Sequence, residues 1–506
     1  LSNIDFPYTL NDKSKCDKYA SAWSLKKILL PSGGQMEMQY ESGDYAYVQN
    51  RRACNMYSIY GLGKTTNYVN NSNMFNSGLS SIDNNYVYIK LLEPLVSTNS
   101  TDLKSEIFSK YLEDMTQPGG KKQLAFKLQI NYPKGPEPLT VYAEYDDYGL
   151  CSNAGSSKDY IFIHLKDVDG KSPLAKSAIG FLTENIPGQA FDGYNVEVDG
   201  LEAFIAMAGG MLSSLKNAFR NVDEQMRNAP KGRSIDLNKS FIRLANPSKI
   251  KYGSGVRVKK IIVRDNWNKM SDQYNSVYGQ EYDYKTTEKI NGIEKSISSG
   301  VASYEPGIGS EENPFREIIS FNNKMPLASA QYGAIEMPML EGLYPSPNVV
   351  YSKVTVKSIH RKGTHGDSSL RSAIGKQVSE FYTAREFPSF SCYTPMDSKE
   401  YNKNPFFSFF YKEVINRRAI TQGFLVETND MHGKIKSQVA YSESDEKTAL
   451  SASYHSYKNT GRNGLNDKVD FVYSNEGGTV RSGNMGVDME LMTDVREFSV
   501  MSKGFN

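Results

Sequence analysis

The sequence is poor in the residues that most often build metal sites. It has five histidines and four cysteines among 506 residues, and no two cysteines form a CxxC pair. No HExxH motif occurs, and His360 and His365 are five positions apart, which suits neither one helical face nor one strand face. The other histidines are His432, His455 and His164, which falls in an apolar strand and is expected to pack there. We therefore expect no metal and no other cofactor.

Charge of one sign is also lacking. Lys and Arg total 59 against 57 Asp and Glu, a net charge of +2, which disfavours nucleic acid as a partner. No run approaches the roughly 18 apolar residues of a membrane helix, so no membrane-spanning segment is expected. The opening "LSNIDFPYTLNDKSK" has neither a basic start nor an apolar centre, so no signal peptide is expected in this chain.

The few cysteines do not define a disulfide framework. Cys16, Cys54, Cys151 and Cys392 allow three pairings, and the sequence does not choose among them. A chain of this length does not need disulfides for stability, which favours unpaired structural thiols. The disulfide status of the four residues stays open at this point.

Tyrosine is abundant where tryptophan is rare, with 34 Tyr against two Trp. Tyrosine favours strands and half-buried faces where its hydroxyl stays in water. Asn, Ser and Gly are also frequent, as in chains with many turns. The composition predicts a mainly β fold, in which many short antiparallel strands and hairpins form a large sheet or shell with an inserted helical segment.

Four regions are predicted along the chain. Residues 1–100 are typical of β hairpins with loops, and residues 101–171 of a helix followed by strands. Residues 172–234 form the helical insert, and residues 235–506 are almost wholly β.

Two helices are predicted in detail. The first has Thr101 or Asp102 as its expected N-cap and carries Leu103, Ile107 and Tyr111 on one stripe. In the helical insert, Ser172 precedes Pro173, a typical helix start. A second run there has apolar residues at helical spacing, interrupted by Gly209 and Gly210; these residues are Leu201, Phe204, Ile205, Met211, Leu212, Leu215, Phe219, Val222 and Met226.

A hairpin is predicted at residues 24–42, "SLKKILLPSGGQMEMQYES". Its second arm alternates, with Met36, Met38 and Tyr40 on one face. Its first arm carries Lys26 and Lys27 on opposite faces, which is typical of an edge strand or of a sheet with water on one side. A loose pattern of this kind recurs along the chain: a strand with Lys and Ile or Val, then a turn, then a strand in which Tyr stands beside an acidic or polar residue. The examples are Lys26–Glu41, Lys259–Asp283, Lys434–Ser442 and Lys468–Ser474. Such hairpins bury their apolar faces only when they associate, so we expect a continuous sheet.

Two short motifs resemble catalytic signatures without their context. "YGLGKTT" has Gly63, Lys64 and Thr65 of a phosphate loop, but Ser58 stands at the position of the first glycine, and no strand-to-helix turn is predicted. Ser213 and Lys216 have the Ser-x-x-Lys spacing of serine acylases, without the partner segments of those enzymes. The polar face of an amphipathic helix explains this second motif better.

Carboxylates form three groups of interest. Asp167 and Asp169 precede Gly170 like the start of a calcium loop, but the later ligands are missing, so a β-turn is favoured. Glu144 with Asp146, and Glu281 with Asp283, alternate along strands and are expected to share a face. Such pairs serve glycoside hydrolysis only across a cleft, so solvated strand ends explain them equally well.

Several segments together resemble a known group. "SLKKILLPSGGQMEMQYES" resembles the Leu-Lys-Lys-Ile-x-x-Pro-(Ser/Thr)-Gly-Gly…Tyr-Glu segments of large Bacteroidota-type proteins with YD/Rhs-like repeats. Further similar segments lie at Ser299–Glu317, Tyr344–Val356, Val378–Pro388 and Met485–Phe498. The resemblance implies a secreted or surface-displayed bacterial protein, distantly similar to Rhs and toxin-complex shell proteins. Strictly periodic YD repeats, the Asp-Pro-x-Gly-Leu motif and a recognisable toxin domain are missing.

These features favour a non-enzymatic β scaffold or shell section of a large exported protein, carrying or presenting a cargo or effector domain outside this chain. Its expected partners are other segments of the same polypeptide or secretion-system components. Two alternatives stay open. One is a surface adhesin or carbohydrate-binding module that uses exposed tyrosines to bind a glycan, and the other is a carboxylate-dependent glycoside hydrolase.

Overall fold

The structure is a computed structural model, and the chain folds into two compact units. It describes residues 12–77, 82–91, 93–115, 122–184, 186–190, 227–228, 231–266, 277–290, 293–306, 317–323, 331–337, 348–360, 374–393, 397–403, 411–427, 431–443, 445, 447–457, 468–473, 478–484 and 488–504. Unit 1 contains Leu1–Thr9, Ala53–Pro247 and Gly307–Met337, and unit 2 contains Leu10–Arg52, Ser248–Pro306 and Pro338–Asn506. The prediction of a mainly β chain with antiparallel sheets is confirmed. The predicted boundaries after residues 100, 171 and 234 stay predictions.

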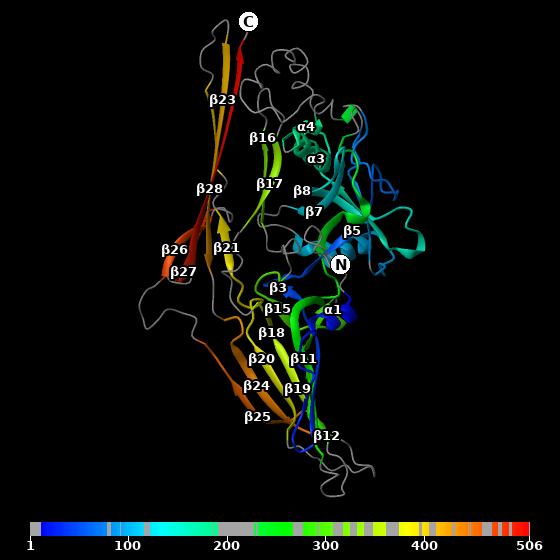
Figure 1. Cartoon of the computed structure of the whole chain (residues 1–506), viewed down its shortest axis with the longest axis vertical. Helices are drawn as coiled ribbons and strands as arrows, with labels where there is room; N and C mark the ends of the chain where they lie inside the picture. Colours follow the sequence, from blue (N-terminus) through cyan, green and yellow to red (C-terminus); the bar gives the residue numbers. More distant parts are fainter. Residues whose placement is uncertain are drawn as a thin grey trace. The chain divides into compact units, whose positions relative to one another are not determined.

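Unit 1 is built on a closed six-stranded barrel (Figure 1). The strands follow the order β10-β5-β6-β9-β8-β7. Their bounds are β5 Cys54–Gly63, β6 Tyr86–Lys90, β7 Gln123–Tyr132, β8 Gly135–Leu150, β9 Tyr160–Leu165 and β10 Phe241–Ala245. Alternate residues such as Val87 and Ile89 point into a core that is fully buried. A separate hairpin, β16 (Glu317–Asn323) with β17 (Gln331–Met337), completes the described strands of this unit.

The first predicted helix is present and packs against the barrel core. It is α2, Ser100–Ile107, followed by a π-helical turn, Phe108–Leu112, and a 3-10 turn, Glu113–Met115. Ile107 and Tyr111 are buried as the stripe predicted. The predicted N-cap is two or three residues late, because the residue that caps the helix is Asn99, whose side chain accepts a hydrogen bond from the Asp102 amide.

Two helices lie in the predicted insert at 172–234. They are α3, Pro173–Glu184, and α4, Pro187–Ala190. The expected start before Pro173 is confirmed, and the Ser172 amide donates to Asp83 at 2.8 Å. The second predicted run, which includes Gly209 and Gly210, lies outside the described residues. Among the described helices, none is long and apolar enough to cross a membrane.

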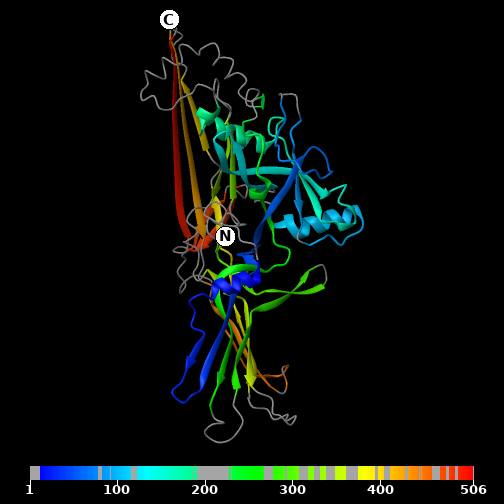
Figure 2. The ribbon, with the colours of Figure 1, turned by 45° about the vertical axis from the view of Figure 1, so that its right-hand side comes forward.

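Unit 2 contains an eight-stranded sheet in the order β1-β2-β11-β12-β19-β20-β24-β25 (Figures 1 and 2). Every neighbouring pair in it is antiparallel. The bounds are β1 Lys27–Leu29, β2 Gln35–Tyr45, β11 Lys251–Arg264, β12 Val277–Asp283, β19 Lys353–His360, β20 Ile374–Phe381, β24 Ile435–Ser442 and β25 Ala449–Tyr454. Helix α1, Lys13–Ala20, packs on β2 and β11.

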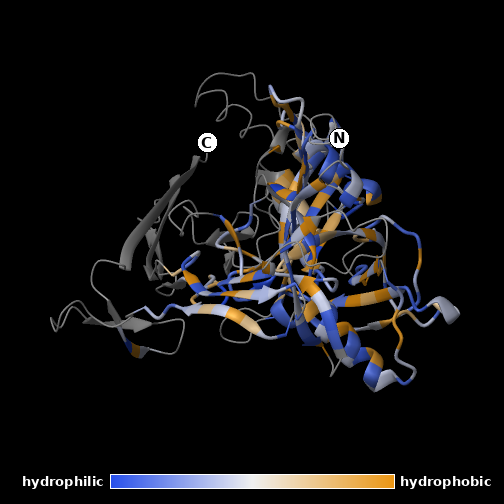
Figure 3. Cartoon of the chain, turned by 90° about the horizontal axis from the view of Figure 1, so that it is seen from below, coloured by the Kyte–Doolittle hydropathy of each residue, from blue (hydrophilic) through white to orange (hydrophobic). Residues whose placement is uncertain are grey.

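The hairpin predicted at residues 24–42 is confirmed as β1 and β2. Leu29 pairs with Gln35, and Gly33 in the turn has a φ of 81°, a conformation that glycine adopts without strain. Among the described strands, β1 is one of the two outermost strands of its sheet, in agreement with the edge that its irregular pattern predicted. Three of the four recurring hairpin segments contribute strands to this one sheet. Figure 3 colours the described residues by hydropathy, and hydrophilic and hydrophobic residues are interspersed along the ribbons.

Smaller sheets complete unit 2. One four-stranded sheet has the order β18-β15-β3-β4, in which β15 pairs parallel with β3. A second joins β21, β23 and β22, with β28 along β23; β13 pairs β14, and β26 pairs β27. The bounds are β3 Tyr47–Val48, β4 Arg51–Arg52, β13 Lys285–Ile290, β14 Ile293–Ser298, β15 Gly300–Ala302, β18 Val349–Tyr351, β21 Phe390–Tyr393, β22 Asp397–Lys403, β23 Tyr411–Glu427, β26 Lys468–Tyr473, β27 Thr479–Asn484 and β28 Asp488–Gly504.

Candidate functional site

The carboxylate pair in the barrel lies on its surface, beside a lysine and a histidine. Glu144 is 3.1 Å from the Lys166 ammonium, and Asp146 is 2.5 Å from Nδ1 of His164. The register shifts between Tyr145 and Asp147. His164 lies in the apolar strand β9 as expected, where it is half-buried and its ring packs on that of Tyr86 at 4.4 Å between centroids.

The second carboxylate pair lies on β12 and is exposed. Glu281 is opposite Lys260 on one neighbouring strand and Lys357 on the other, and Asp283 is opposite Thr355. Cross-strand partners of opposite charge stabilise a sheet by roughly 0.2–1 kcal/mol per pair. Both carboxylate pairs thus have ordinary surface environments.

The glycines of "YGLGKTT" have a packing role. A Cβ on Gly63 would lie 2.7 Å from Cζ of Tyr88, so only a glycine lets this ring lie across β5. The Tyr88 hydroxyl donates to the carbonyl of Thr65 at 2.8 Å. Ser213 and Lys216, the other motif, lie outside the described residues.

The calcium-like segment is a tight turn. Val168 and Lys171 pair across it, and the two residues between them, Asp169 and Gly170, have positive φ values of 54° and 73°. The Asp167 carboxylate accepts a hydrogen bond from Asn85. Within the described ranges, no group of three His, Cys, Asp or Glu residues is placed to hold a metal ion.

The remaining histidines and cysteines are dispersed. Nδ1 of His432 accepts a hydrogen bond from the Ala384 amide at 2.9 Å. Cys16 and Cys151 are free thiols, and burial raises the pKa of Cys151 to about 12. Sγ of Cys54 lies 4.0 Å from Sδ of Met115 in the barrel core. The side chain of Cys392 and all of His365 lie outside the described residues.

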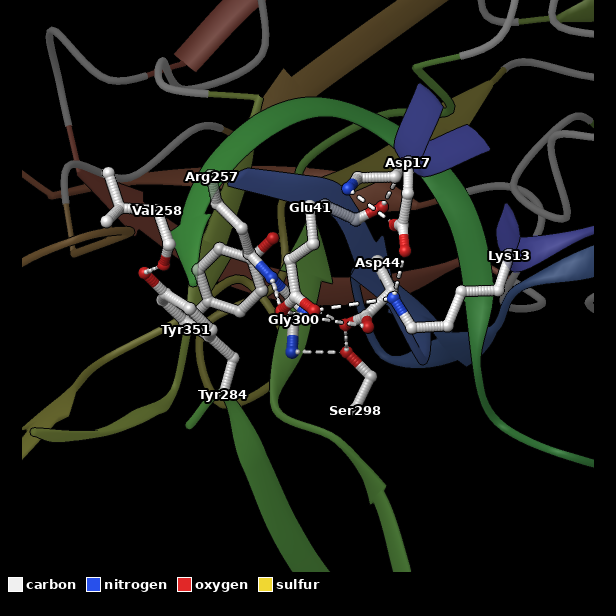
Figure 4. A network of polar contacts seen from close by, with 12 residues as sticks. Lys13, Asp17, Glu41, Asp44, Arg257, Val258, Tyr284, Ser298, Gly300 and Tyr351 are labelled. Carbon is white, nitrogen blue, oxygen red and sulfur yellow. Dashed lines mark hydrogen bonds and ion pairs between the residues drawn. The ribbon is translucent and has the colours of Figure 1, made fainter. Parts of the chain in front are cut away.

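A network of polar contacts in unit 2 surrounds Arg257 on β11 (Figure 4). Its two terminal nitrogens each donate to a carboxylate oxygen of Asp44 at 2.8 Å, and Nε donates to Glu41 at 2.9 Å. The guanidinium lies over the rings of Tyr284 and Tyr351, 4.4 and 5.0 Å from their centroids. A planar cation thus meets two carboxylates at its edge and aromatic rings at its face.

The network extends from this arginine into other elements. Lys13 of α1 bridges Asp17 at 2.7 Å and Glu41 at 3.3 Å. The Asp17 carboxylate also accepts a hydrogen bond from the Ser42 amide at 2.9 Å, and Ser298 at the end of β14 donates to Asp44. The network therefore connects helix α1, the adjacent strands β2 and β11, and the end of the β13–β14 hairpin.

The charges at this point are fixed by their surroundings. Burial alone would lower the pKa of Arg257, but the hydrogen bonds to Asp44 and the nearby negative charge of Glu41 outweigh it and raise the pKa above its usual value. The arginine is therefore a permanent cation. Because its donors are already occupied by carboxylates, it serves to hold elements together.

A second network joins other segments of unit 2. The Glu288 carboxylate accepts hydrogen bonds from Tyr47 at 2.8 and 2.9 Å, and from Lys249 and Arg385 at 2.8 Å each. Burial would raise the pKa of Glu288, but these three donors outweigh it and lower the pKa to about 2. Burial raises the pKa of Tyr47, so its hydroxyl keeps its proton and donates.

Unit 1 has a buried ion pair of its own. Arg227 donates to both oxygens of Asp83, at 2.6 and 3.0 Å, and both side chains are almost fully buried. The guanidinium lies 5.2 Å from the centroid of Phe75. Asp83 also accepts from the Ser172 amide, so it joins the start of α3 to a loop of the barrel unit.

The outer face of the barrel carries an aromatic layer, defined here as Tyr60, Tyr68, Tyr86, Tyr88, Tyr160 and Phe162. Tyr68 packs on Tyr160 at 4.6 Å between centroids and on Tyr88 at 5.6 Å. Within the layer, Tyr88 and Phe162 are buried, whereas Tyr60 is 38% exposed. Lys90 lies 5.4 Å from the centroid of Tyr160. The layer is thus a small second core with a partly exposed rim.

Sequence reasoning did not find the Arg257 network. Arg257 occurs in "GVRVKK", an unremarkable strand segment, and its carboxylates are more than two hundred positions away. No local pattern signals a contact of that separation. The only hint was "YESGDY", which places Glu41 and Asp44 between two tyrosines, Tyr40 and Tyr45, in one strand.

The chain matches no known family profile, no curated protein and no solved structure.

Proposed function

We propose that this chain is a non-enzymatic β scaffold, a section of a large exported bacterial protein of the YD/Rhs-like type. In this proposal it is secreted or displayed at the cell surface, and it carries or presents a cargo or effector domain outside this chain. Its partners are other segments of the same polypeptide or components of a secretion system.

The observation that carries the proposal is the use of polar side chains in unit 2. Arg257 and Glu288 are each surrounded by partners from several elements, so their charges connect strands instead of pointing into an open site. The carboxylates first considered for hydrolysis, Glu144 and Glu281, lie beside lysines. The hydrolase alternative stays a prediction, and its test is whether a measured activity survives Glu144→Gln combined with Glu281→Gln.

Limited trypsin digestion of the full chain tests the scaffold. The strands contain many cleavage sites, including Lys259 in β11 and Lys357 in β19, which a continuous sheet protects. We expect early cuts between elements and long-lived fragments that keep these lysines. Rapid digestion of residues 235–506 into small peptides would contradict the proposal.

The aromatic layer favours a second proposal, a glycan-binding surface on the barrel. Tyr60 at its rim is partly exposed, and tyrosine rings can stack on sugars while Lys90 contacts their hydroxyl groups. A glycan array should then lose its signal on Tyr60→Ala but keep it on Tyr454→Ala, a more exposed tyrosine of unit 2. Absence of binding above background removes this proposal.

A further inference from the structure

An exposed apolar stretch runs from the end of helix α1 into strand β1, within unit 2 (Figure 2). Six large apolar side chains are exposed between residues 19 and 30, whereas the other eleven in the described part of the chain are spread from Tyr60 to Val480. The six are Tyr19, Trp23, Leu25, Ile28, Leu29 and Leu30. Trp23 is fully exposed, and Leu29 is 71% exposed. A contiguous exposed apolar surface of this kind marks a site of interaction.

The backbone of this stretch is held in place by the sheet. Strand β1 pairs with β2, and the carbonyl of Lys26 accepts a hydrogen bond from the Met38 amide at 2.9 Å. The Tyr40 hydroxyl donates to the carbonyl of Leu25 at 3.0 Å. The apolar side chains are therefore presented by a backbone that is hydrogen-bonded along the edge of the sheet.

Trp23 has a backbone conformation that the fold does not explain. Its φ is 65°, in the left-handed region that a bulky residue adopts only at a cost in free energy. Because its side chain is fully exposed, packing within the described part of the chain does not offset that cost. Contact with a partner outside the chain explains why an indole is held in this position.

The same part of the chain is basic. Residues 13–30 contain five lysines and one aspartate, a net charge of +4, whereas the whole chain has a net charge of +2. Lys18, Lys26 and Lys27 are exposed and form no ion pair with another described residue. The exposed charge beside the apolar side chains is therefore positive, and it is complementary to an anionic surface.

The neighbouring carboxylates are already engaged. Asp17 is 2.7 Å from the Lys13 ammonium, and Glu37 on β2 lies 3.9 Å from Arg264. Asp12 caps helix α1 by accepting hydrogen bonds from two backbone amides. The exposed lysines of residues 13–30 thus remain in excess over the acidic groups around them.

The arrangement of β1 favours a fluid partner over a folded one. Ile28 and Leu29 are consecutive strand residues, so their side chains lie on opposite faces, and all three residues of β1 are exposed. A folded protein that packs on one face of the strand leaves the other face in water, whereas the headgroup region of a bilayer surrounds both. Trp and Tyr concentrate at bilayer interfaces, where lysines extend their apolar stems and place the ammonium among the headgroups.

We propose that residues 13–30 dock unit 2 on the surface of a lipid bilayer that contains anionic headgroups. Trp23 and the neighbouring leucines enter the boundary between headgroups and acyl chains, and Lys18, Lys26 and Lys27 contact the phosphates. This inference goes beyond the scaffold proposal and does not rest on it. Because a few lysines and apolar side chains form the contact, binding should be reversible and should weaken as salt screens the charges.

Co-sedimentation of the full chain with sucrose-loaded vesicles tests the charge requirement. The vesicles are phosphatidylcholine, with or without about 30% phosphatidylserine, and we expect binding to be at least about tenfold stronger with the anionic lipid. Lys26→Gln combined with Lys27→Gln should weaken binding about twentyfold, or about fivefold for each lysine. The matched control is Lys285→Gln combined with Lys289→Gln, two exposed lysines of β13 in the same unit, which should leave binding unchanged.

The fluorescence of Trp23 reports where the chain meets the vesicle. The other tryptophan, Trp267, lies outside the described residues and is replaced in a Trp267→Phe background. On binding, the emission of Trp23 should shift to shorter wavelength and be quenched by brominated lipid, because the indole enters the interface.

Replacing the indole tests its part in binding. Trp23→Gly should weaken binding about tenfold, and glycine adopts the left-handed backbone without strain, so this variant should fold. Ile82→Ala, a change at a 73% exposed residue of unit 1, is the control and should bind as the native chain does. Unchanged circular dichroism spectra check that each variant is folded.

Three results would overturn the proposal. The first is a native chain that stays unbound at about 1 mM anionic lipid. The second is binding that leaves the emission of Trp23 unchanged, which would place the contact elsewhere. The third is self-association without vesicle binding that Trp23→Gly abolishes, which would make a second copy the partner. Each leaves the scaffold untouched, since resistance of the sheet to trypsin tests that proposal separately.

Discussion

At the scale of single residues, Arg257 shows how this chain uses buried charge. Taking a guanidinium out of water is costly, and the cost is offset only when its donors and its faces all find partners. Here the carboxylates of Asp44 and Glu41 meet its edge, and Tyr284 and Tyr351 lie against its faces. Removing this one side chain leaves the Asp44 carboxylate without its arginine, and it leaves Glu41 with Lys13 as its cation.

Arg257→Ala should therefore destabilise unit 2 by about 3–5 kcal/mol, the range for breaking a buried ion pair. The measurement is the free energy of unfolding from denaturant titration followed by tyrosine fluorescence. Arg264→Ala is the control on the same strand, since Arg264 is 45% exposed and 3.9 Å from Glu37. Arg264→Ala should lower the free energy of unfolding by less than about 1 kcal/mol. Equal losses in the two variants would show that the Arg257 network does not stabilise the fold.

Glu288 predicts how stability depends on pH. Its pKa is about 2 in the folded protein against an ordinary 4.5, because three donors outweigh the effect of burial. A lowered pKa stabilises the fold above pH 4.5, and this contribution, about 2–3 kcal/mol, is lost as the pH falls from 4.5 towards 2. The stability of Glu288→Gln should thus be lower than native at pH 7 and approach it near pH 2. Glu294→Gln, an exposed change on β14, should follow the native curve at every pH.

At the scale of elements, the packing of the barrel depends on aromatic rings that lie directly against glycines of neighbouring strands. Tyr88 lies across Gly63 of β5, and Phe162 lies against Gly149 of β8, where an added Cβ would be 3.0 Å from the ring. Glycine normally weakens a strand because it has no side chain to pack. In this barrel the neighbouring aromatic ring fills that space and covers the strand.

Gly63→Ala should therefore destabilise unit 1 by about 1–3 kcal/mol, because the ring of Tyr88 has to move. Gly180→Ala is the opposite control: nothing lies within 4 Å of the added Cβ, and the residue is inside helix α3. Alanine there should stabilise the helix by up to about 1 kcal/mol. Thermal unfolding of both variants shows whether each substitution lowers or raises the stability. If Gly63→Ala leaves the stability unchanged, the ring of Tyr88 does not require a glycine at this position.

Local elements were predictable because their signals are local. The β1–β2 hairpin follows from the alternation in its second arm and the turn residues that precede it, and α2 follows from its apolar stripe. The first turn of α2 was placed late because the pattern of apolar residues says nothing of the Asn99 cap. The pairing of β2 with β11 could not be predicted, since Tyr40 and Val258 are brought together only by the whole sheet.

At the scale of the whole molecule, the chain contains separate hydrophobic cores. The largest fills the barrel of unit 1, and a small one in unit 2 is formed by Ala46, Tyr47, Ile297, Val301 and Ala384. Unit 2 has fewer large buried apolar side chains than the barrel among the described residues, and polar networks occur where its elements meet. Its cohesion should thus depend more on charged side chains, and that of the barrel more on packing.

Hydrogen exchange followed by mass spectrometry can test this division. Arg257→Ala should speed amide exchange in α1, β2 and β11 while β6 and β9 exchange as in the native chain, because local opening depends on the contacts of each unit. Gly63→Ala should do the reverse, with faster exchange in β5, β6 and β9 only. Raising the salt concentration should speed exchange around Arg257 only slightly, since buried pairs are weakly screened. If either variant speeds exchange equally in both units, their stabilities are coupled and the two cores do not act separately.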